Sequence, residues 1–371
     1  MANPFSYGSP VEGARFAGRA EELAALTARM RDGINVVLIS PRRYGKTSLL
    51  RRAIRQHRQS GGAVLHVNVL LCRNATMLAT HLANDAWTLE GRWHRAKHTT
   101  ATFVRRLRVT PSVTFDGDKP TFRFSADLTA EDVDTVISDI YRVLAELDQP
   151  AALVLDEFQA ITDLGPHLPG LLKGLADELP QVSLVLAGSR RHLMERLVSA
   201  RDAPLYGMAE HVALDVIPDA VMVGFLRRRS QAGGKPMTAE AASWLLEQAG
   251  PIPNDIQHLA YEAFDGAGAR VTTADVAAGF GRVVAHESSM HATRFEALPA
   301  GQRRVVLELA STPATEPYAA AFAQRVGLAS PASVRKAVHK LLDDELVVAR
   351  HGTLRVSDPF FAGWLRQASP S

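Results

Sequence analysis

Two short segments contain the residue types and the spacing that bind and cleave a nucleoside triphosphate. The first, 40–48, reads SPRRYGKTS and follows an apolar run at 34–40. Between a strand and a helix, such a loop surrounds phosphate oxygens with backbone N–H groups, and the N-terminus of the helix adds partial positive charge. We therefore expect ATP to bind along this loop. The expected contact residues are Ser40, Pro41, Arg42, Arg43, Tyr44, Gly45, Lys46, Thr47 and Ser48.

Three positions of this loop have distinct expected roles. Lys46 supplies a positive charge for the β- and γ-phosphates, and the hydroxyl of Thr47 is a ligand for Mg²⁺. Gly45 lets the backbone approach phosphate because it has no Cβ. Ser40 departs from the usual pattern, which begins with glycine, and a small residue fits there if its φ is negative.

The second segment, LVLDEFQ at 153–159, is an apolar strand that ends in two carboxylates. Ligands of open α/β sheets lie at the carboxyl ends of the strands, so we expect this pair beside the phosphate loop. Asp156 is expected to hold Mg²⁺ through water, and Glu157 to orient or deprotonate the attacking water. The alternative is a solvated acidic pair that opens a loop.

A further apolar strand, at 182–187, is followed by Gly188 and Ser189. A small polar side chain at this strand end can reach the γ-phosphate or the attacking water, so we count Ser189 with Lys46 and Glu157 as catalytic. The alternative for Ser189 is an ordinary turn residue. Arg190 and Arg191 follow, and the sequence leaves open whether they face phosphate, a neighbouring subunit or solvent.

The elements that must position these residues alternate between strand and helix. Apolar runs of strand length, without polar alternation, are typical of strands buried on both faces of a parallel sheet. Strands that alternate with amphipathic helices predict an α/β domain of three layers. The expected strands are 34–40, 63–71, 151–155, 182–187 and 211–216, with a separate hairpin at 113–125.

After Pro218 the strand pattern stops, and four helical stretches separated by Gly or Pro follow at 219–286. From Pro299 the expected order is three helices and then a short pair of strands, which is that of a winged helix-turn-helix. We therefore expect three domains: a P-loop core at 1–217, a helical lid at 218–290 and a winged helix at 291–371.

The third helix of the last domain, at 331–344, places its cations opposite an apolar stripe, and a short wing follows it. A basic helix face and a basic wing tip suit the major groove and the phosphates of double-stranded DNA. The alternatives are a solvated face or a surface for protein contacts. The residues expected to contact DNA are Arg335, Lys336, His339, Lys340 and Arg350.

Composition narrows the class of protein without naming a partner. The 371 residues suggest two or three domains at roughly 100–200 residues each. The formal net charge of +3 does not by itself demand a nucleic-acid partner. The single Cys72 allows no intramolecular disulfide, and we find no signal peptide and no apolar run long enough to span a membrane. We expect a cytoplasmic protein without a membrane partner.

These motifs, together with others, resemble the archaeal-type ATPase family of AAA+/STAND P-loop NTPases, as found in its bacterial members. The segments NPF at 3–5, FAGR at 16–19 and PLYG at 204–207 occur in the family's order. The resemblance implies an AAA+-like core, a helical lid and a C-terminal winged helix. It also implies that Phe16 and Arg19 of the N-terminal arm lie against the adenine, and that Pro253 of the lid adjoins the nucleotide.

Two departures from the family pattern favour slow hydrolysis. Relatives usually carry Arg after PLYG, where this chain has Met208, so another arginine such as Arg201 would have to replace it. Asn254 supplies no positive charge towards the γ-phosphate. We therefore expect an ATPase of weak activity that requires ATP and Mg²⁺.

Three functions fit these expectations. In the first, ATP closes the lid on the core, and the closed form presents the winged helix to DNA or a protein until hydrolysis resets it. In the second, the protein is a DNA-binding regulator or initiator whose ATP site governs self-association with little turnover. In the third, it is a nucleotide-stabilised scaffold for a defence or transport assembly.

Overall fold

The computed structural model describes residues 3–93, 100–117, 119–350 and 352–368. The chain forms two compact units, one of Gly18–Val216 and one in which residues 3–17 join the chain from Ile217 onward. The first unit has one buried apolar cluster, and the second unit has two. No helix of the described residues is long and apolar enough to cross a lipid bilayer.

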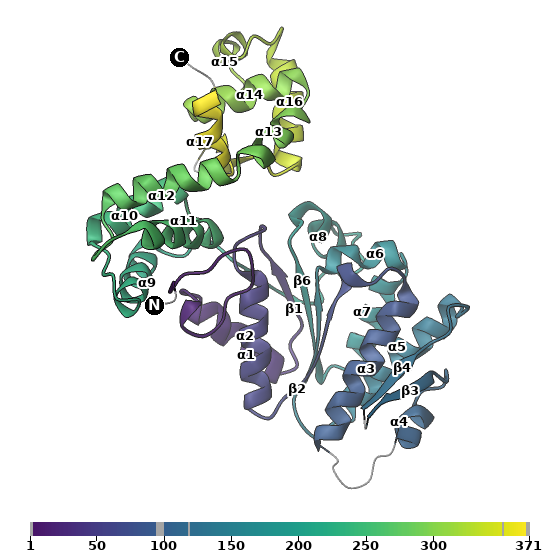
Figure 1. Cartoon of the computed structure of the whole chain (residues 1–371). Coiled ribbons are helices and arrows are strands. Elements are labelled where there is room, and N and C mark those ends of the chain that lie inside the picture. Colours follow the sequence, from purple (N-terminus) through teal and green to yellow (C-terminus); the bar gives the residue numbers. More distant parts are fainter. Residues whose placement is uncertain (1–2, 94–99, 118, 351, 369–371) are drawn as a thin grey trace. The chain divides into compact units, whose positions relative to one another are not determined.

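The first unit is built on a five-stranded sheet in which every pair is parallel (Figure 1). Its strand order is β2-β5-β6-β1-β7, so β6 lies between β1 and β5. Every residue of β5 and β6 is buried, as their continuous apolar sequences predict. The strands are β1 (Val36–Ile39), β2 (Ala63–Asn68), β5 (Ala151–Asp156), β6 (Val182–Gly188) and β7 (Glu210–Ala213).

Helices cover both faces of this sheet, which gives the expected three layers (Figure 1). Helices α1 and α2 pack on one face, and α3, α5 and α7 pack on the other. Helix α5 begins at a capping box in which Thr129 and Asp132 satisfy each other's backbone N–H groups. The helices of this unit are α1 (Ala20–Arg31), α2 (Lys46–Gln59), α3 (Ala75–Trp93), α4 (Thr100–Arg106), α5 (Ala130–Ala145), α6 (Ile161–Leu164), α7 (Leu168–Glu178) and α8 (Arg191–Val198).

Between α4 and α5 the chain forms the expected hairpin, of β3 (Ser112–Asp116) and β4 (Lys119–Arg123). Gly117 at the turn has a φ of 59°, a value that glycine adopts without steric cost. Phe122 of β4 is fully buried against Trp87 and Phe103. The hairpin is therefore anchored to the core through its second strand.

In the second unit, residues 3–17 pack with helices that lie more than two hundred positions later in the sequence. Phe5 is 1% exposed and meets the rings of Phe225 and Phe264 edge to face. Asn3 donates a hydrogen bond to the carbonyl of Tyr261, and the amide of Gly8 donates one to Asn254. From the sequence we expected this arm to belong to the P-loop core, whereas the structure groups it with the helices that bury its aromatic ring.

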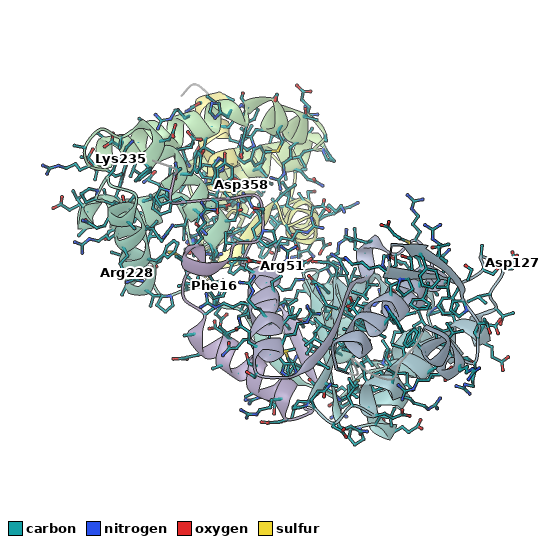
Figure 2. The ribbon with its side chains drawn as sticks, turned by 60° about the horizontal axis from the view of Figure 1, so that its bottom comes forward. Phe16, Arg51, Asp127, Arg228, Lys235 and Asp358 are labelled. Carbon is teal, nitrogen blue, oxygen red and sulfur yellow. The ribbon has the colours of Figure 1, made fainter. Side chains whose placement is uncertain are left out.

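Four of these helices match the expected stretches at 219–286: α9 (Asp219–Ala232), α10 (Ala239–Ala249), α11 (Pro253–Gly266) and α12 (Thr273–His286). Lys235, labelled in Figure 2, donates hydrogen bonds to the carbonyls of Phe264 and Ala267 at the end of α11. A cation at a helix C-terminus satisfies carbonyls that have no partner within the helix and opposes the negative end of its dipole.

The C-terminal part has the helices and the two-stranded wing of a winged helix. Asp358, labelled in Figure 2, accepts hydrogen bonds from the backbone N–H groups of Phe360 and Phe361 and so caps the last helix. The elements are α13 (Ser288–Glu296), α14 (Ala300–Ser311), α15 (Ala320–Arg325), α16 (Pro331–Asp343), β8 (Val347–Arg350), β9 (Thr353–Val356) and α17 (Pro359–Ala368).

The α/β class, the sheet and the winged helix are confirmed, and the sequence analysis missed some helices. It did not predict α6, α8, α13 or α17. A single residue, Glu287, separates α13 from the end of α12, and helix α6 has four residues. Apolar periodicity cannot resolve elements that are so short or so closely joined.

Candidate nucleotide-binding site

The phosphate loop leaves β1 and ends at Gly45, directly before α2. Gly45 has a φ of 91°, and a Cβ built on it would meet nothing within 4 Å. Glycine is therefore favoured at this position by its backbone conformation and not by a lack of space for a side chain. Arg43 also has a left-handed φ, of 71°. Ser40 keeps a negative φ, which meets the condition under which a small residue can replace the usual glycine. The amide of Ser40 donates to the carbonyl of Gly188 at the end of β6.

Lys46 lies between the two carboxylates of the acidic segment. Its Nζ pairs with Oδ1 of Asp156 and lies 3.0 Å from Oε1 of Glu157. Lys46 is 5% exposed and Asp156 is 1% exposed, so these charges are paired out of contact with solvent. A buried ammonium group that lost its partners would be strongly unfavourable. We expect phosphate oxygens to take over this role when nucleotide binds.

Glu157 combines an unusual backbone with a well-defined carboxylate environment. Its φ of 53° places a non-glycine residue in the left-handed region, which is uncommon and costs energy. Burial alone would raise the pKa of Glu157. The charge of Lys46 and hydrogen bonds from Gln159, Lys46 and Ser189 outweigh burial and hold that pKa below its usual 4.5. The side chain is therefore ionised and able to accept a proton at neutral pH.

Ser189 reaches Glu157 because of the strand order. Strand β6 lies between β1 and β5, so the residue after β6 stands between the phosphate loop and the acidic pair. The Oγ of Ser189 donates a hydrogen bond of 2.8 Å to Oε2 of Glu157, and Ser189 is 5% exposed. The structure thus brings together Lys46, Asp156, Glu157 and Ser189.

The hydroxyl of Thr47 donates to Oδ2 of Asp156 over 3.4 Å. A hydroxyl and a carboxylate oxygen are hard ligands, and Mg²⁺ in nucleotide sites takes few protein ligands because water and phosphate oxygens complete its shell. These two residues fit a magnesium ion shared with a nucleotide. Among the described residues no cluster of three or more His, Cys, Asp or Glu side chains could hold a metal ion by itself.

Two residues near this network carried no assignment in the sequence analysis. Gln159 donates a hydrogen bond of 2.6 Å from Nε2 to Oε2 of Glu157. His66 of β2 is coupled electrostatically to Asp156, and burial holds the pKa of its imidazole below 6.5 although Asp156 and Asp85 oppose this effect. Gln159 stands in the segment LVLDEFQ, so its position two residues after Glu157 was the available signal.

Arg19 directly precedes α1, has a left-handed φ of 64° and is 7% exposed. Its Nη1 pairs with Glu22 over 2.7 Å, while its Nε and Nη2 are buried and find no hydrogen-bond partner in the part of the chain that the structure describes. Two unsatisfied donors suit a polar ligand. Phe16 and Pro253 belong to the other compact unit, so their nucleotide contacts stay predictions.

The two departures from the family pattern have local structural roles. Met208 is half-buried and packs against the core of the first unit. Asn254 accepts the hydrogen bond from the amide of Gly8. Arg201, the suggested substitute for an arginine after PLYG, is exposed in the turn that follows α8.

Four of the five residues predicted to contact DNA lie on the outer side of α16, and the fifth lies in the wing. Arg335, Lys336, His339 and Lys340 are exposed, and Arg350 is partly exposed at the end of β8. The Nζ of Lys340 pairs with Asp344 over 2.8 Å, which weakens its contribution to a positive surface. The guanidinium of Arg335 lies 5.4 Å from the ring centre of Tyr318.

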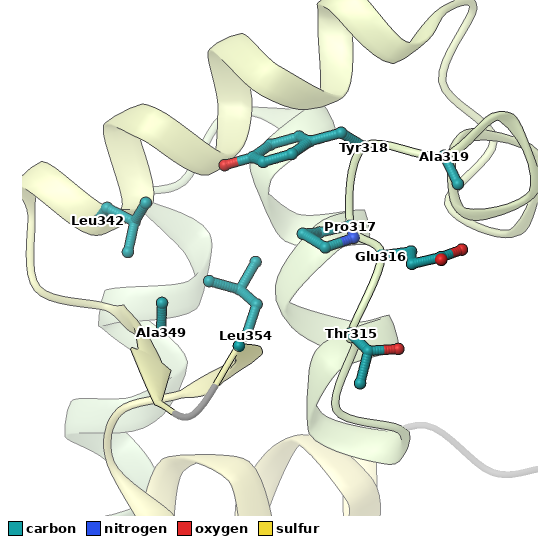
Figure 3. A pocket seen from close by; sticks show the side chains of 9 residues that line it. Thr315, Glu316, Pro317, Tyr318, Ala319, Leu342, Ala349 and Leu354 are labelled. Carbon is teal, nitrogen blue, oxygen red and sulfur yellow. The ribbon is translucent and has the colours of Figure 1, made fainter.

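Beside α16 lies a pocket of about 420 Å³. Figure 3 shows Pro317, Leu342 and Leu354 at this pocket, with Tyr318 and Glu316 on the segment that borders it. An apolar pocket next to a basic helix face could also bind a partner protein. DNA binding and protein binding therefore both remain predictions for the winged helix.

Comparison with known proteins agrees with this architecture. The family described as "Probable winged helix domain" matches residues 289–367. No curated protein sequence matches the chain. A Walker-type ATPase of Pyrococcus abyssi superposes with a TM-score of 0.67 at 16% identity, over 98% of this chain and 99% of that one.

Two further solved structures share the fold. The ORC2 protein of Aeropyrum pernix, in ADPNP–ADP complexes, superposes with a TM-score of 0.58 at 14% identity, over 99% of this chain and 98% of that one. The ORC1 protein of Aeropyrum pernix in complex with DNA gives 0.50 at 15% identity, over 97% and 94% of the two chains. This chain therefore shares with these structures the fold of a parallel α/β core followed by helices, and the C-terminal part matches a winged helix.

Proposed function

We propose that this protein binds ATP with Mg²⁺, hydrolyses it slowly, and uses the bound nucleotide as a switch that controls a DNA- or protein-binding winged helix. One observation carries the proposal. Lys46 at the start of α2, Asp156 and Glu157 at the end of β5, and Ser189 after β6 meet in a single network of hydrogen bonds and ion pairs. Each has the chemistry required at a phosphoryl-transfer site.

In this proposal the residues of the chain divide the work. The backbone N–H groups of the phosphate loop and the ammonium of Lys46 bind the β- and γ-phosphates. The carboxylate of Glu157 accepts a proton from the attacking water, and the hydroxyl of Ser189 turns towards the γ-phosphate. Thr47 and Asp156 hold Mg²⁺, which when bound neutralises the charge that develops on the phosphate oxygens.

Slow turnover follows from the same network. Lys46 and Ser189 both contact Glu157, so ATP must draw them away before either can meet phosphate. No arginine follows PLYG in this sequence, because Met208 occupies that position. A cation supplied at the developing charge accelerates such reactions by about 10³- to 10⁵-fold, so methionine at this position favours a long-lived ATP state.

The comparisons support the nucleotide part of the proposal more directly than the rest. One similar structure is a Walker-type ATPase, and another is an ADPNP–ADP complex. A third is a complex with DNA, which supports the DNA-binding form of the proposal. Each similarity is one of fold, at identities of 14–16%.

The test is ATP binding and hydrolysis by the full chain, compared with a Lys46→Ala variant. We expect the parent to bind a fluorescent ATP analogue in the presence of Mg²⁺ and to release phosphate slowly. Lys46→Ala should lose both, while Lys173→Ala on α7 should behave as the parent. Equal binding by the parent and Lys46→Ala would contradict the proposed site.

The second candidate is a DNA-binding regulator or scaffold with little turnover, favoured by the exposed cations of α16. Binding to duplex DNA across a salt series, without nucleotide, with ADP and with a non-hydrolysable ATP analogue, distinguishes these cases. Salt-sensitive binding that changes with nucleotide supports a DNA-acting switch. Absence of binding in all three states assigns the winged helix to protein contacts.

A further inference from the structure

The carboxylate of Glu157 has three side-chain partners, and they are not equivalent. Oε1 lies 3.0 Å from Nζ of Lys46. Oε2 accepts hydrogen bonds from Oγ of Ser189, over 2.8 Å, and from Nε2 of Gln159, over 2.6 Å. Both oxygens are therefore engaged, although a general base needs one oxygen available for the proton of water.

Two of these partners have another role in the proposed function. Lys46 and Ser189 are the groups expected to contact phosphate, and a phosphate anion competes directly with a carboxylate for an ammonium or hydroxyl donor. Gln159 has no such role. Once ATP has drawn the other two away, Gln159 is the described partner that stays on Oε2, while Oε1 becomes free.

We propose that Gln159 is the positioning residue of the hydrolytic site, which holds Oε2 of Glu157 so that Oε1 faces the attacking water. The inference rests on the proposed function and adds a residue to it. The proton of water goes to Oε1, and the amide of Gln159 neither gains nor loses a proton. Its contribution is to restrict rotation of the carboxylate, because catalysis by a base depends on its orientation towards the reacting atom.

The structure supports this role through the way in which Gln159 is held. It is 8% exposed and lies in the single turn η3 (Phe158–Ala160), between Phe158 and the start of α6 at Ile161, which are both fully buried. The turn follows Glu157 directly, so the backbone that carries the base also fixes Gln159. A buried anchor on each side leaves the amide little freedom to move.

The neighbouring strand leaves space for this amide. A Cβ added to Gly188 of β6 would lie 2.7 Å from Oε1 of Gln159 and 2.4 Å from Cγ of Met194. Both distances are too short for real contacts, so glycine at this position keeps the space that Gln159 occupies. Gly188 immediately precedes Ser189. Two successive residues at the end of β6 thus shape the surroundings of Glu157: Gly188 leaves space for Gln159, and Ser189 donates a hydrogen bond.

The hydrogen bond to Glu157 sets the orientation of the Gln159 amide, and the carbonyl oxygen of that amide does not contribute to it. Oε1 of Gln159 is buried and has no hydrogen-bond partner among the residues that the structure describes. An unsatisfied buried acceptor costs free energy. The side chain keeps this arrangement because its Nε2 donates to an ionised carboxylate, and hydrogen bonds to charged groups are stronger than those between neutral groups.

The experiment is single-turnover hydrolysis by the full chain with saturating Mg²⁺ and ATP, together with the Kd for ATP. In Gln159→Met the side chain keeps its length and loses the amide. We expect the hydrolysis rate to fall on the order of 10- to 100-fold, because a base displaced by about 1 Å loses up to that factor. The Kd for ATP should stay within about twofold, since Gln159 has no phosphate contact in this scheme.

Gln181→Met is the matched control, because Gln181 is exposed and its side chain donates a hydrogen bond to the carbonyl of Ala145, away from the nucleotide site. It should behave as the parent. Gln159→Asn keeps an amide that is one methylene too short, and it makes the same test if Gln159→Met does not fold. Gly188→Ala should lower the rate in the parent and have little further effect in Gln159→Met, because both act on one contact.

The outcomes separate this inference from the proposed function. A parent rate in Gln159→Met and Gln159→Asn, with Glu157→Gln inactive, overturns the positioning role and leaves the ATPase proposal intact. A loss of ATP affinity that parallels the loss of rate also overturns it, because a positioning residue changes the rate alone. A parent that binds ATP without any turnover overturns the proposed hydrolysis and the role of Gln159 with it.

Discussion

Ser189 donates a hydrogen bond of 2.8 Å from its hydroxyl to Oε2 of Glu157, which joins the ends of β6 and β5. These two side chains are the group expected to meet the γ-phosphate and the group expected to activate water. Because they contact each other, a phosphate that attracts Ser189 also changes the environment of the base. In the proposed function, this contact links detection of ATP to its hydrolysis.

Replacing Glu157 with glutamine should separate binding from turnover. The amide cannot accept the proton of water, and loss of a general base lowers rates by about 10²- to 10⁴-fold. ATP should still bind, because Lys46 and the loop remain. Phosphate release and analogue binding measure the two properties, with Glu178→Gln on the exposed end of α7 as the control. Turnover at the parent rate in Glu157→Gln would show that the catalytic assignment is wrong.

Gly45→Ala should destabilise the protein and weaken ATP binding. At a φ of 91° an L-residue is strained, at a cost of about 1–2 kcal/mol. Urea unfolding measures the stability, and titration with the fluorescent ATP analogue measures the binding.

The control for this substitution is Gly174→Ala, within α7. Gly174 lies in a helix, and an added Cβ would meet nothing within 4 Å. Alanine is favoured over glycine there by about 0.5–1 kcal/mol, so this variant should be at least as stable as the parent. If the two alanine variants changed stability alike, backbone strain at Gly45 would not be the reason.

Joint replacement of Arg335 and Lys336 by alanine should weaken binding to duplex DNA without preference for sequence. Each lost phosphate contact lowers the dependence of log K on log salt by about 0.9, so the slope should fall by about 1.8. Electrophoretic or fluorescence titrations at several salt concentrations measure it. Arg270→Ala removes an exposed charge outside the winged helix and should leave the slope unchanged. An unchanged slope in the double variant would exclude this face of α16 as the DNA surface.

His291→Leu should make the stability less sensitive to acid. His291 is fully buried, and both ring nitrogens lack a hydrogen-bond partner among the described residues, although Nε2 lies 3.5 Å from Oε2 of Glu287. Burial holds its pKa below 6.5, with Asp358 opposing and Arg294 reinforcing this shift. The unfolded chain therefore binds more protons than the folded one between the folded-state pKa and 6.5.

Because the unfolded chain binds more protons, His291 lowers the parent's stability as the pH falls below 6.5, and this effect is absent above that value. We expect the Tm of the parent to fall between pH 7.5 and pH 5.5 more steeply than that of His291→Leu. His81→Leu, at an exposed position of α3, should keep the parent's slope. Equal slopes for the parent and His291→Leu would contradict the prediction.

The sequence determined the α/β core, the winged helix and the local form of the phosphate loop. Apolar runs that lack alternation can only be buried on both faces, which specified β1, β5 and β6. Strands β5 and β6 were predicted to within one residue of their observed limits, because the residues that end a strand act within a few positions. These are properties of neighbouring residues, and neighbouring residues are what a sequence displays.

The tertiary structure decided which distant residues meet. The strand order places β6 between β1 and β5, and this alone brings Ser189 and the gap at Gly188 to Glu157 and Gln159. Likewise, the arm at residues 3–17 packs with α9 and α11 because Phe5 finds its apolar partners there. Strand order and side-chain burial depend on the free energy of packing the whole chain, and no local pattern contains that quantity.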